Sequence, residues 1–202
     1  MKRLLFLGDS ITDCGRLWHP EHNGLGDGYV KIIADFLHME APSLEIINKG
    51  HDGFTLPAIL RNLSVDCLSL TPDLVTILVG VNDVSIAMNT GKSLSQQHFR
   101  ENYSVLLDRL LSQSSAKIVC MGPFLFPYPQ EYNLWIPTVL KVEEMTASLA
   151  GEYGLPFLPL HKPLNRLAKE LGCPAVTTDG IHLTSEGHKL IAKIWLAHYY
   201  GI

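Results

Sequence analysis

The stretch Arg3-Leu-Leu-Phe-Leu-Gly-Asp-Ser10 near the N-terminus decides the fold, because an apolar run there ends abruptly in a polar turn. A continuous apolar run of this length is typical of a parallel strand buried on both faces. Gly8 is a natural breaker at its end, since glycine tolerates turn conformations that hinder other residues. Open α/β sheets bind ligands beyond the carboxyl ends of their strands. The stretch therefore predicts that Ser10 is presented at such an end rather than buried.

The rest of the chain alternates apolar runs of strand length with segments of helical period. Further strands are expected at 44–47, 74–79, 117–121 and 156–160, and helices at 29–37, 55–70, 95–111, 138–153, 164–171 and 186–199. Ser185 is a candidate N-cap for the last helix. Strands that alternate with helices imply parallel pairing through right-handed crossovers. The sequence thus predicts an α/β fold, a three-layer α/β/α sandwich with a five-stranded parallel sheet of flavodoxin-like order. The 202 residues fit a single domain spanning 1–202.

A serine nucleophile needs a neighbouring base and a third group that orients the base. Near the C-terminus stands Asp179-Gly-Ile-His182, in which one short turn could aim the carboxylate at the imidazole. We expect His182 to act as general base toward Ser10 and then as general acid toward the leaving group. Asp179 would fix the imidazole tautomer and stabilise the imidazolium. Among nine histidines, only His182 follows an aspartate by three residues in a short polar turn before a helix.

Two more polar blocks follow apolar runs, Asn48-Lys-Gly-His-Asp-Gly53 and Gly80-Val-Asn-Asp83. Gly53 could supply a backbone amide and Asn82 a side-chain amide to an oxyanion. The plainer alternatives are a turn glycine at a strand end and a capping asparagine. Ser10 could likewise do no more than satisfy a turn.

These four blocks, in this order, resemble those of the SGNH (GDSL-type) hydrolases, and the resemblance covers nearly the whole chain. It implies the flavodoxin-like SGNH hydrolase fold and a catalytic triad of Ser10, His182 and Asp179. It also implies an oxyanion hole formed by the Ser10 backbone amide, the Gly53 amide and the Asn82 side chain. The GxSxG elbow of the larger α/β-hydrolases is absent, because Thr12 stands where its last glycine belongs.

The resemblance further implies a serine esterase that cleaves carboxylic esters through an acyl-enzyme, without metal or organic cofactor. The continuation Ser10-Ile-Thr-Asp-Cys-Gly15 resembles small bacterial GDSL esterases, including carbohydrate deacetylases, so we expect a small acyl group such as acetyl on a sugar or another small alcohol. The family also includes lysophospholipases and thioesterases, so acyl length and alcohol stay open. A non-catalytic flavodoxin-like binding module is the alternative from another class.

Composition excludes several other classes. A net charge of −4 and the lack of any Lys/Arg block give no reason to expect nucleic acid. The apolar run 4–7 is shorter than the ~7–15 residues of a signal peptide core, and no stretch approaches the ~18–20 residues of a membrane span. Four cysteines without ligand spacing are typical of reduced, buried thiols in a cytoplasmic protein. The expected partner is a small-molecule ester, and the sequence does not indicate an oligomeric state.

Other polar residues receive structural interpretations. We expect Asp9, Asp13 and Asp83 to hold loops through backbone hydrogen bonds, and His188 to be structural. Cys14 is a rival nucleophile, but no histidine is paired with it in sequence.

Two histidine groups and one long loop complete the candidates. Neither His19-Pro-Glu-His22 nor His51-Asp52 offers three or four metal ligands, so no metal is expected. The aromatic segment 124–137 is either a wall of the substrate pocket or a core-covering loop or dimer contact.

Overall fold

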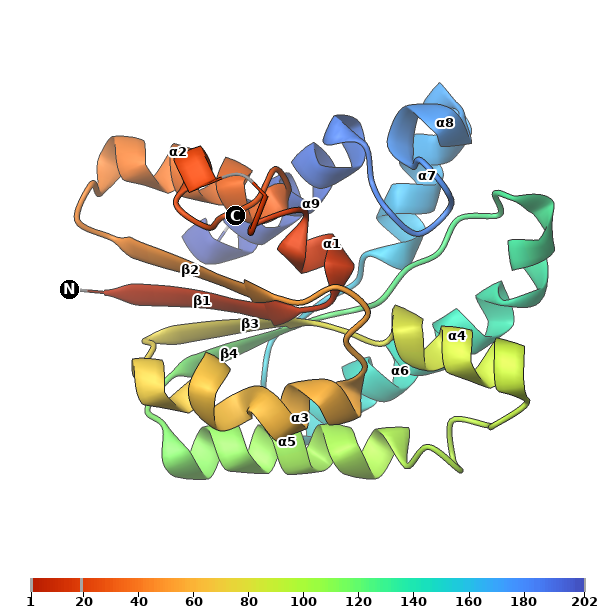
Figure 1. The fold of residues 1–202 in the computed structure, drawn as a ribbon, viewed down its shortest axis with the longest axis horizontal. Coiled ribbons are helices and arrows are strands. Elements are labelled where there is room, and N and C mark those ends of the chain that lie inside the picture. Colours follow the sequence, from red (N-terminus) through yellow and green to blue (C-terminus); the bar gives the residue numbers. More distant parts are fainter. Residues whose placement is uncertain (1, 19, 202) are drawn as a thin grey trace.

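A five-stranded parallel sheet forms the middle layer of the computed structural model, which describes residues 2–18 and 20–201 (Figure 1). Its strands, in chain order, are β1 (Arg3–Gly8), β2 (Glu45–Gly50), β3 (Leu74–Leu78), β4 (Lys117–Met121) and β5 (Phe157–Leu158). The order across the sheet is β2-β1-β3-β4-β5. The predicted α/β fold and flavodoxin-like order are therefore confirmed.

The inner strand β1, between β2 and β3, is buried because its apolar run is covered on both faces. Leu4, Leu5 and Phe6 expose none of their surface. In the sheet register, Gly8 at the end of β1 lies beside Gly50 of β2 and Leu78 of β3. The segments that follow these three strands consequently leave the sheet at the same edge.

Helices cover both faces of the sheet. Those described are α1 (Ser10–Asp13), α2 (Tyr29–Glu40), α3 (Leu56–Asp66), α4 (Val81–Thr90), α5 (Phe99–Gln113), α6 (Ile136–Glu152), α7 (His161–Leu171), α8 (Cys173–Val176) and α9 (Ser185–Tyr200). Short 3-10 turns occupy η1 (Pro20–His22), η2 (Leu68–Leu70) and η3 (Gln130–Leu134). Figure 1 shows α2 and α9 on one face, and α3 and α5 on the other. These layers form the predicted sandwich.

One buried cluster joins the last helix to the sheet. The Trp195 indole of α9 donates to Thr76 Oγ1 of β3 at 2.9 Å, and its ring lies 5.3 Å from that of Phe6. Phe6 also meets Tyr29 of α2, edge to face, at 5.9 Å. Because α9 begins three residues after His182, this anchor also holds the segment that carries His182.

The structure corrects several predicted element boundaries. Residues 81–90 form α4, which the sequence analysis did not predict, because its polar start looks like a loop block. The helix expected from Ser95 begins instead at Phe99, because His98 adopts a left-handed conformation with φ of 54°. The N-cap of α9 is Thr184 rather than Ser185. The helix expected at 55–70 ends at Asp66 and is followed by a separate 3-10 turn.

The four cysteines are unpaired. Cys67 and Cys120 are buried, as expected, whereas Cys14 and Cys173 are only half-buried, so the expectation of burial is wrong for those two. Within residues 2–18 and 20–201, no helix is both long and apolar enough to cross a membrane.

A side chain at Gly8 should disrupt the end of β1. A Cβ atom there would lie 2.1 Å from Thr12 Oγ1 and 2.7 Å from the Leu78 carbonyl oxygen, which is backbone and cannot swing away. We expect Gly8→Ala to lower the free energy of unfolding in urea by ~1–3 kcal/mol. Gly151→Ala is the matched control, because its Cβ would meet nothing within 4 Å in an exposed turn of α6. Equal stability of Gly8→Ala and wild type would contradict the close packing.

Candidate active site

Ser10 is the first residue of the short helix α1, which directly follows β1. Asp9 is its N-cap, and the Asp9 carboxylate accepts the Ile11 N–H at 3.0 Å. The helix ends at Cys14, which adopts a left-handed conformation with φ of 41° and donates its N–H to the Ser10 carbonyl at 2.9 Å. As the first helical residue, Ser10 has no acceptor for its own N–H within the helix. Ser10 therefore faces the edge of the sheet with a free amide.

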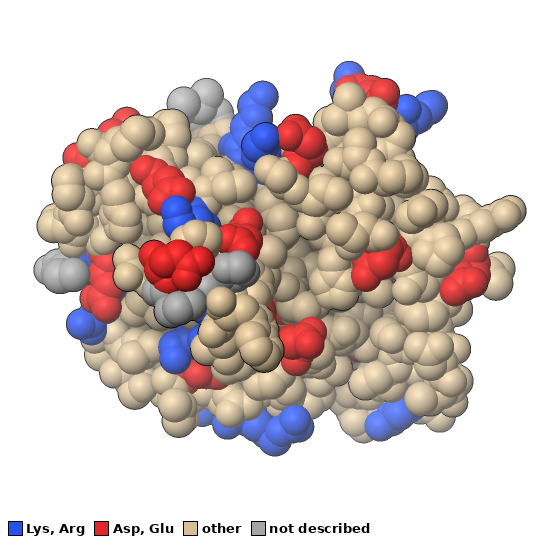
Figure 2. Space-filling view, turned by 45° about the horizontal axis from the view of Figure 1, so that its top comes forward, with Lys and Arg blue, Asp and Glu red and all other residues tan. Residues whose placement is uncertain are grey.

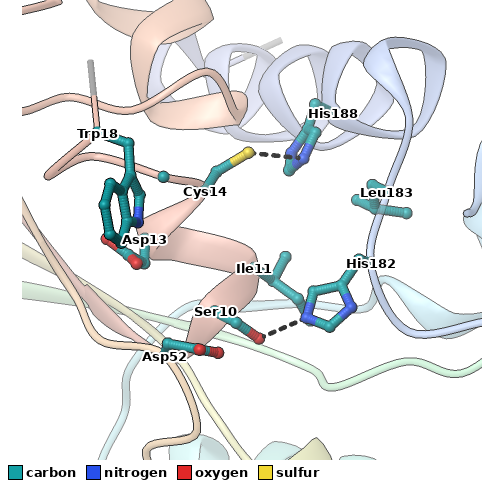
Figure 3. A pocket seen from close by; sticks show the side chains of 10 residues that line it. Ser10, Ile11, Asp13, Cys14, Trp18, Asp52, His182, Leu183 and His188 are labelled. Atoms are coloured by element: carbon teal, nitrogen blue, oxygen red, sulfur yellow. Dashed lines mark hydrogen bonds between the residues drawn. The ribbon is translucent and has the colours of Figure 1, made fainter. Parts of the chain in front are cut away.

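The structure brings Ser10, His182 and Asp179 into one hydrogen-bonded line. Ser10 Oγ lies 2.9 Å from His182 Nε2, a contact drawn in Figure 3. His182 Nδ1 lies 2.6 Å from Asp179 Oδ2. A carboxylate can only accept, so Nδ1 carries the proton and Nε2 is left to accept from the serine hydroxyl. This is the tautomer that a general base toward Ser10 requires.

Asp179 is held by the backbone of its own turn. Its Oδ1 accepts the N–H groups of His182 at 2.7 Å and Ile181 at 2.9 Å. Burial raises the pKa of Asp179, but the hydrogen bonds from the His182 side chain and from these two amides outweigh it, so its pKa lies below the usual range. The ionised form that stabilises an imidazolium is thus favoured.

Two residues that the sequence analysis missed shape this turn. Thr177 Oγ1 donates to the His182 carbonyl at 2.7 Å and accepts the Gly180 N–H at 2.8 Å. Gly180 has φ of 94°, and a Cβ there would lie 1.7 Å from the Tyr128 carbonyl oxygen. Only glycine fits this position, which explains the second residue of the Asp179–His182 block.

The two other proposed oxyanion donors lie on either side of Ser10 in the sheet order. Gly53 follows β2 in a turn with φ of 70°, and among the described residues its N–H has no acceptor. Asn82 lies in the first turn of α4, directly after β3, and its Nδ2 donates one hydrogen to the Phe54 carbonyl at 3.0 Å. An amide has a second hydrogen to offer. The Asn82 bond also ties the Gly53 turn to the start of α4.

A polar network fixes the residues that precede and follow Gly53 in its turn. Arg16 Nε donates to the Gly50 carbonyl at 2.7 Å, and His51 Nε2 lies 2.8 Å from the Asp66 carboxylate. The His51 ring stacks on Phe54 at 4.3 Å. The sequence pattern did not predict that Arg16 binds this turn, because its partner Gly50 is at the end of another strand.

Two buried carboxylates lie beneath the site. Asp83 accepts the Leu56 N–H with both oxygens, at 3.2 and 3.3 Å, and Asp9 caps α1, so both hold loops as predicted. Burial raises the pKa of each to about 7. The Asp13 carboxylate likewise forms a hydrogen bond with the Arg16 backbone, and it also lies 3.2 Å from the Arg16 guanidinium.

A pocket of about 250 Å³ opens beside Ser10. Its described lining comprises Ser10, Ile11, Asp13, Cys14, Gly15, Trp18, Asp52, His182, Leu183 and His188. In Figure 3, Trp18 and Asp13 stand on one side of this pocket and His182 and Leu183 on the other. The sequence analysis did not single out Trp18, which lies in an irregular loop without a motif, and it considered Asp52 only within the Gly53 block and as a metal ligand.

The fold places a histidine, His188, next to Cys14, a contact that the sequence did not reveal. Its Sγ lies 3.4 Å from His188 Nε2. His188 Nδ1 accepts the Tyr29 N–H at 3.2 Å, so in the neutral ring the proton is on Nε2 and points at the sulfur. Burial, and secondarily the nearby His182, lower the pKa of His188 to about 4, and burial raises the pKa of the Cys14 thiol. This histidine cannot take a proton from Cys14, which argues against the rival nucleophile.

The remaining candidates do not join the site. Within residues 2–18 and 20–201, no group of three or more His, Cys, Asp or Glu could hold a metal ion; His19 lies outside the described residues. In the 124–137 loop, Phe124 and Phe126 are fully buried, and the Phe126 N–H bonds to the Gly180 carbonyl at 2.9 Å. That part covers the core, and a role for the rest as a pocket wall stays a prediction.

Comparisons with known proteins identify relatives of the whole chain. The GDSL-like lipase/acylhydrolase family model matches residues 6–190. An acetylxylan esterase from Geobacillus stearothermophilus is 29% identical to this chain. The alignment covers 96% of this chain and 92% of that protein. A solved structure of an acetylxylan esterase from the same organism has a TM-score of 0.84 at 26% identity and covers 96% of this chain and 92% of its own. A protein named as a GDSL-like lipase from Parabacteroides merdae has a TM-score of 0.87 at 27% identity, covering 96% and 94%.

The buried Asp83 should make stability depend on pH. Its pKa is raised from 3.8 to about 7 on folding, so between these values the folded state binds more protons than the unfolded state. The free energy of unfolding should therefore fall as pH rises from about 4 to 7. We expect Asp83→Asn, which stays neutral and keeps an acceptor for Leu56 N–H, to flatten that slope in urea titrations. The exposed Asp35→Asn is the control, and an unchanged slope in Asp83→Asn would contradict the raised pKa.

Proposed function

The chain belongs to the GDSL-like lipase/acylhydrolase family and is a carboxylic ester hydrolase. We propose that it removes acetyl and other short acyl groups from small or carbohydrate alcohols. The observation that supports the ester-cleaving mechanism is the line from Asp179 through His182 to Ser10, with contacts of 2.6 and 2.9 Å. The reaction takes place in one domain spanning 1–202. Membership of an enzyme family removes the non-catalytic alternative.

In the proposed reaction, the Ser10 hydroxyl attacks the ester carbonyl while His182 Nε2 takes its proton. The tetrahedral anion receives hydrogen bonds from the Ser10 and Gly53 amides and the Asn82 side chain. His182 then donates its proton to the leaving alcohol, which leaves Ser10 acylated. Water, activated by the same imidazole, attacks the acyl-enzyme, and the acid leaves as Ser10 regains its proton. Asp179 stays ionised and stabilises the imidazolium in both halves of the cycle.

Two observations support a small, polar ester. The pocket beside Ser10 encloses about 250 Å³, below the ~300–1,000 Å³ of pockets that hold drug-sized ligands, so the portion of the substrate that occupies it is small. Asp13, Asp52 and two histidines lie in its wall, and burying a long alkyl chain against them would desolvate polar groups without compensation. The similarity to an acetylxylan esterase supports acetyl as the acyl group.

Replacement of Ser10 tests the nucleophile. We expect Ser10→Ala to lower kcat for p-nitrophenyl acetate by ~10⁴-fold or more, because no hydroxyl remains to form the acyl-enzyme. Wild type should prefer acetate over butyrate and octanoate, and a fluorophosphonate probe should label Ser10. Ser112→Ala, on the exposed surface of α5, is the control and should keep full activity. Substantial and equal rates for wild type and Ser10→Ala would refute the mechanism.

Replacement of Asn82 tests the oxyanion hole. Loss of one such donor costs ~10²–10³-fold in kcat, with little change in KM, because the bond strengthens only as charge develops. We expect Asn82→Ala to show this pattern with p-nitrophenyl acetate. Asn89→Ala, in the last turn of the same helix, provides the control. A rise in KM with kcat unchanged would assign Asn82 to substrate binding instead.

A further inference from the structure

We infer that the pocket beside Ser10 is the subsite for the alcohol portion of the substrate, and that it selects a neutral polyhydroxyl alcohol such as a sugar ring over a phosphorylated one. Trp18 and Asp52 are the residues that determine this preference. The inference rests on the proposed function, because it assigns an alcohol to the same reaction.

The position of the pocket relative to the reacting groups assigns it to the alcohol. During cleavage, the leaving oxygen must lie against His182 Nε2, which protonates it, while the carbonyl oxygen faces the amides of Gly53 and Asn82. The pocket is lined by Ser10 and His182, whereas Gly53 and Asn82 are not among the described residues of its wall. It therefore lies on the side from which the alcohol leaves.

Trp18 provides an aromatic face at this pocket. Its side chain is 83% exposed although indole is among the largest apolar groups, and it stands across the pocket from His182 (Figure 3). The negative face of an aromatic ring attracts the weakly positive C–H groups of a sugar. A bound ring would cover the indole without deforming the core.

Asp52 supplies a hydrogen-bond acceptor for the hydroxyl groups of the alcohol. A carboxylate only accepts hydrogen bonds, and sugar hydroxyls donate them. Among the described residues, no cation pairs with Asp52, whereas the charge of Asp13 is partly balanced by Arg16 at 3.2 Å. Asp52 is thus the carboxylate most available to a ligand.

The same charges act against phosphorylated alcohols. No lysine or arginine is among the described residues that line the pocket. In Figure 2, Asp and Glu side chains border the hollow in the middle of the face shown. A phosphate placed here would face the carboxylate of Asp52 and that of Asp13, whose charge Arg16 balances only in part, and would be repelled. The pocket therefore favours deacetylation of sugars over hydrolysis of lysophospholipids.

The test uses two pairs of substrates. A methyl xyloside with one acetyl ester is compared with ethyl acetate to measure recognition of the sugar. Acetylglycerol is compared with acetylglycerol phosphate to measure discrimination by charge. For each pair, the ratio of kcat/KM values is determined for wild type and the variants Trp18→Ala, Trp18→Phe and Asp52→Asn.

We expect wild type to prefer the xyloside ester and the uncharged glycerol ester. Trp18→Ala should lower the first ratio about three- to tenfold, mainly through KM, and Trp18→Phe should restore most of it. Asp52→Asn should lower the second ratio by about tenfold. Leu17→Ala is the matched control, since Leu17 is 73% exposed beside Trp18 but does not line the pocket, and both ratios should stay at wild-type values.

Unchanged ratios in Trp18→Ala and Asp52→Asn, or a wild type that hydrolyses the phosphorylated ester as readily as the neutral one, would overturn the inference while leaving the esterase intact. A failure of the proposed function is distinguishable, because hydrolysis of these acetates would then proceed equally in Ser10→Ala and wild type. That result would overturn the subsite as well.

Discussion

The site depends on the parallel pairing of β1 with β2 on one side and β3 on the other. In this register, Gly8, Gly50 and Leu78 lie side by side. Three loops must then start within about 10 Å of one another, since neighbouring strands are ~4.7–4.9 Å apart. Ser10 takes the middle position, between the Gly53 turn and the start of α4. A shift of one residue in either pairing would move a proposed oxyanion donor away from Ser10 and turn the buried side chains of that strand to the opposite face.

Polar groups hold these loops together once the sheet has brought them close. Asn82 donates to the Phe54 carbonyl, and Asp83 accepts the Leu56 amide. On the other side of Ser10, Arg16 binds the Gly50 carbonyl. A buried carboxylate such as Asp83 costs stability when it ionises, so preorganisation of the site is linked to pH.

In the proposed mechanism, Asp179, His182 and Ser10 perform the chemistry, and the pocket beside them selects the substrate. The line from Asp179 to Ser10 could act on any ester whose carbonyl reaches Ser10 Oγ, so it says little about the substrate. The pocket wall adds an exposed aromatic face, from Trp18, and a negative charge, from Asp52. In our proposal an uncharged sugar ring matches both, whereas a phosphate faces carboxylates that Arg16 balances only in part.

The sequence by itself determined the alternation of buried strands and helices, the strand order and the placement of Ser10 at a strand end. It also paired Asp179 with His182, because those residues are three apart and one turn of backbone brings them together. Only the tertiary structure decided what depends on contacts between distant segments: the approach of His182 to Ser10, the place of His188 beside Cys14, the hold of Arg16 on the Gly53 turn, and the presence of Trp18 and Asp52 in the pocket wall. α4 was not predicted either, because Asn82 and Asp83 in its first turn interrupt the apolar pattern, although Val81 and Val84 are buried in the core. The periodicity of apolar residues in a segment indicates which of its side chains are buried. Contacts between loops that are distant in sequence depend instead on the assembly of the whole sheet.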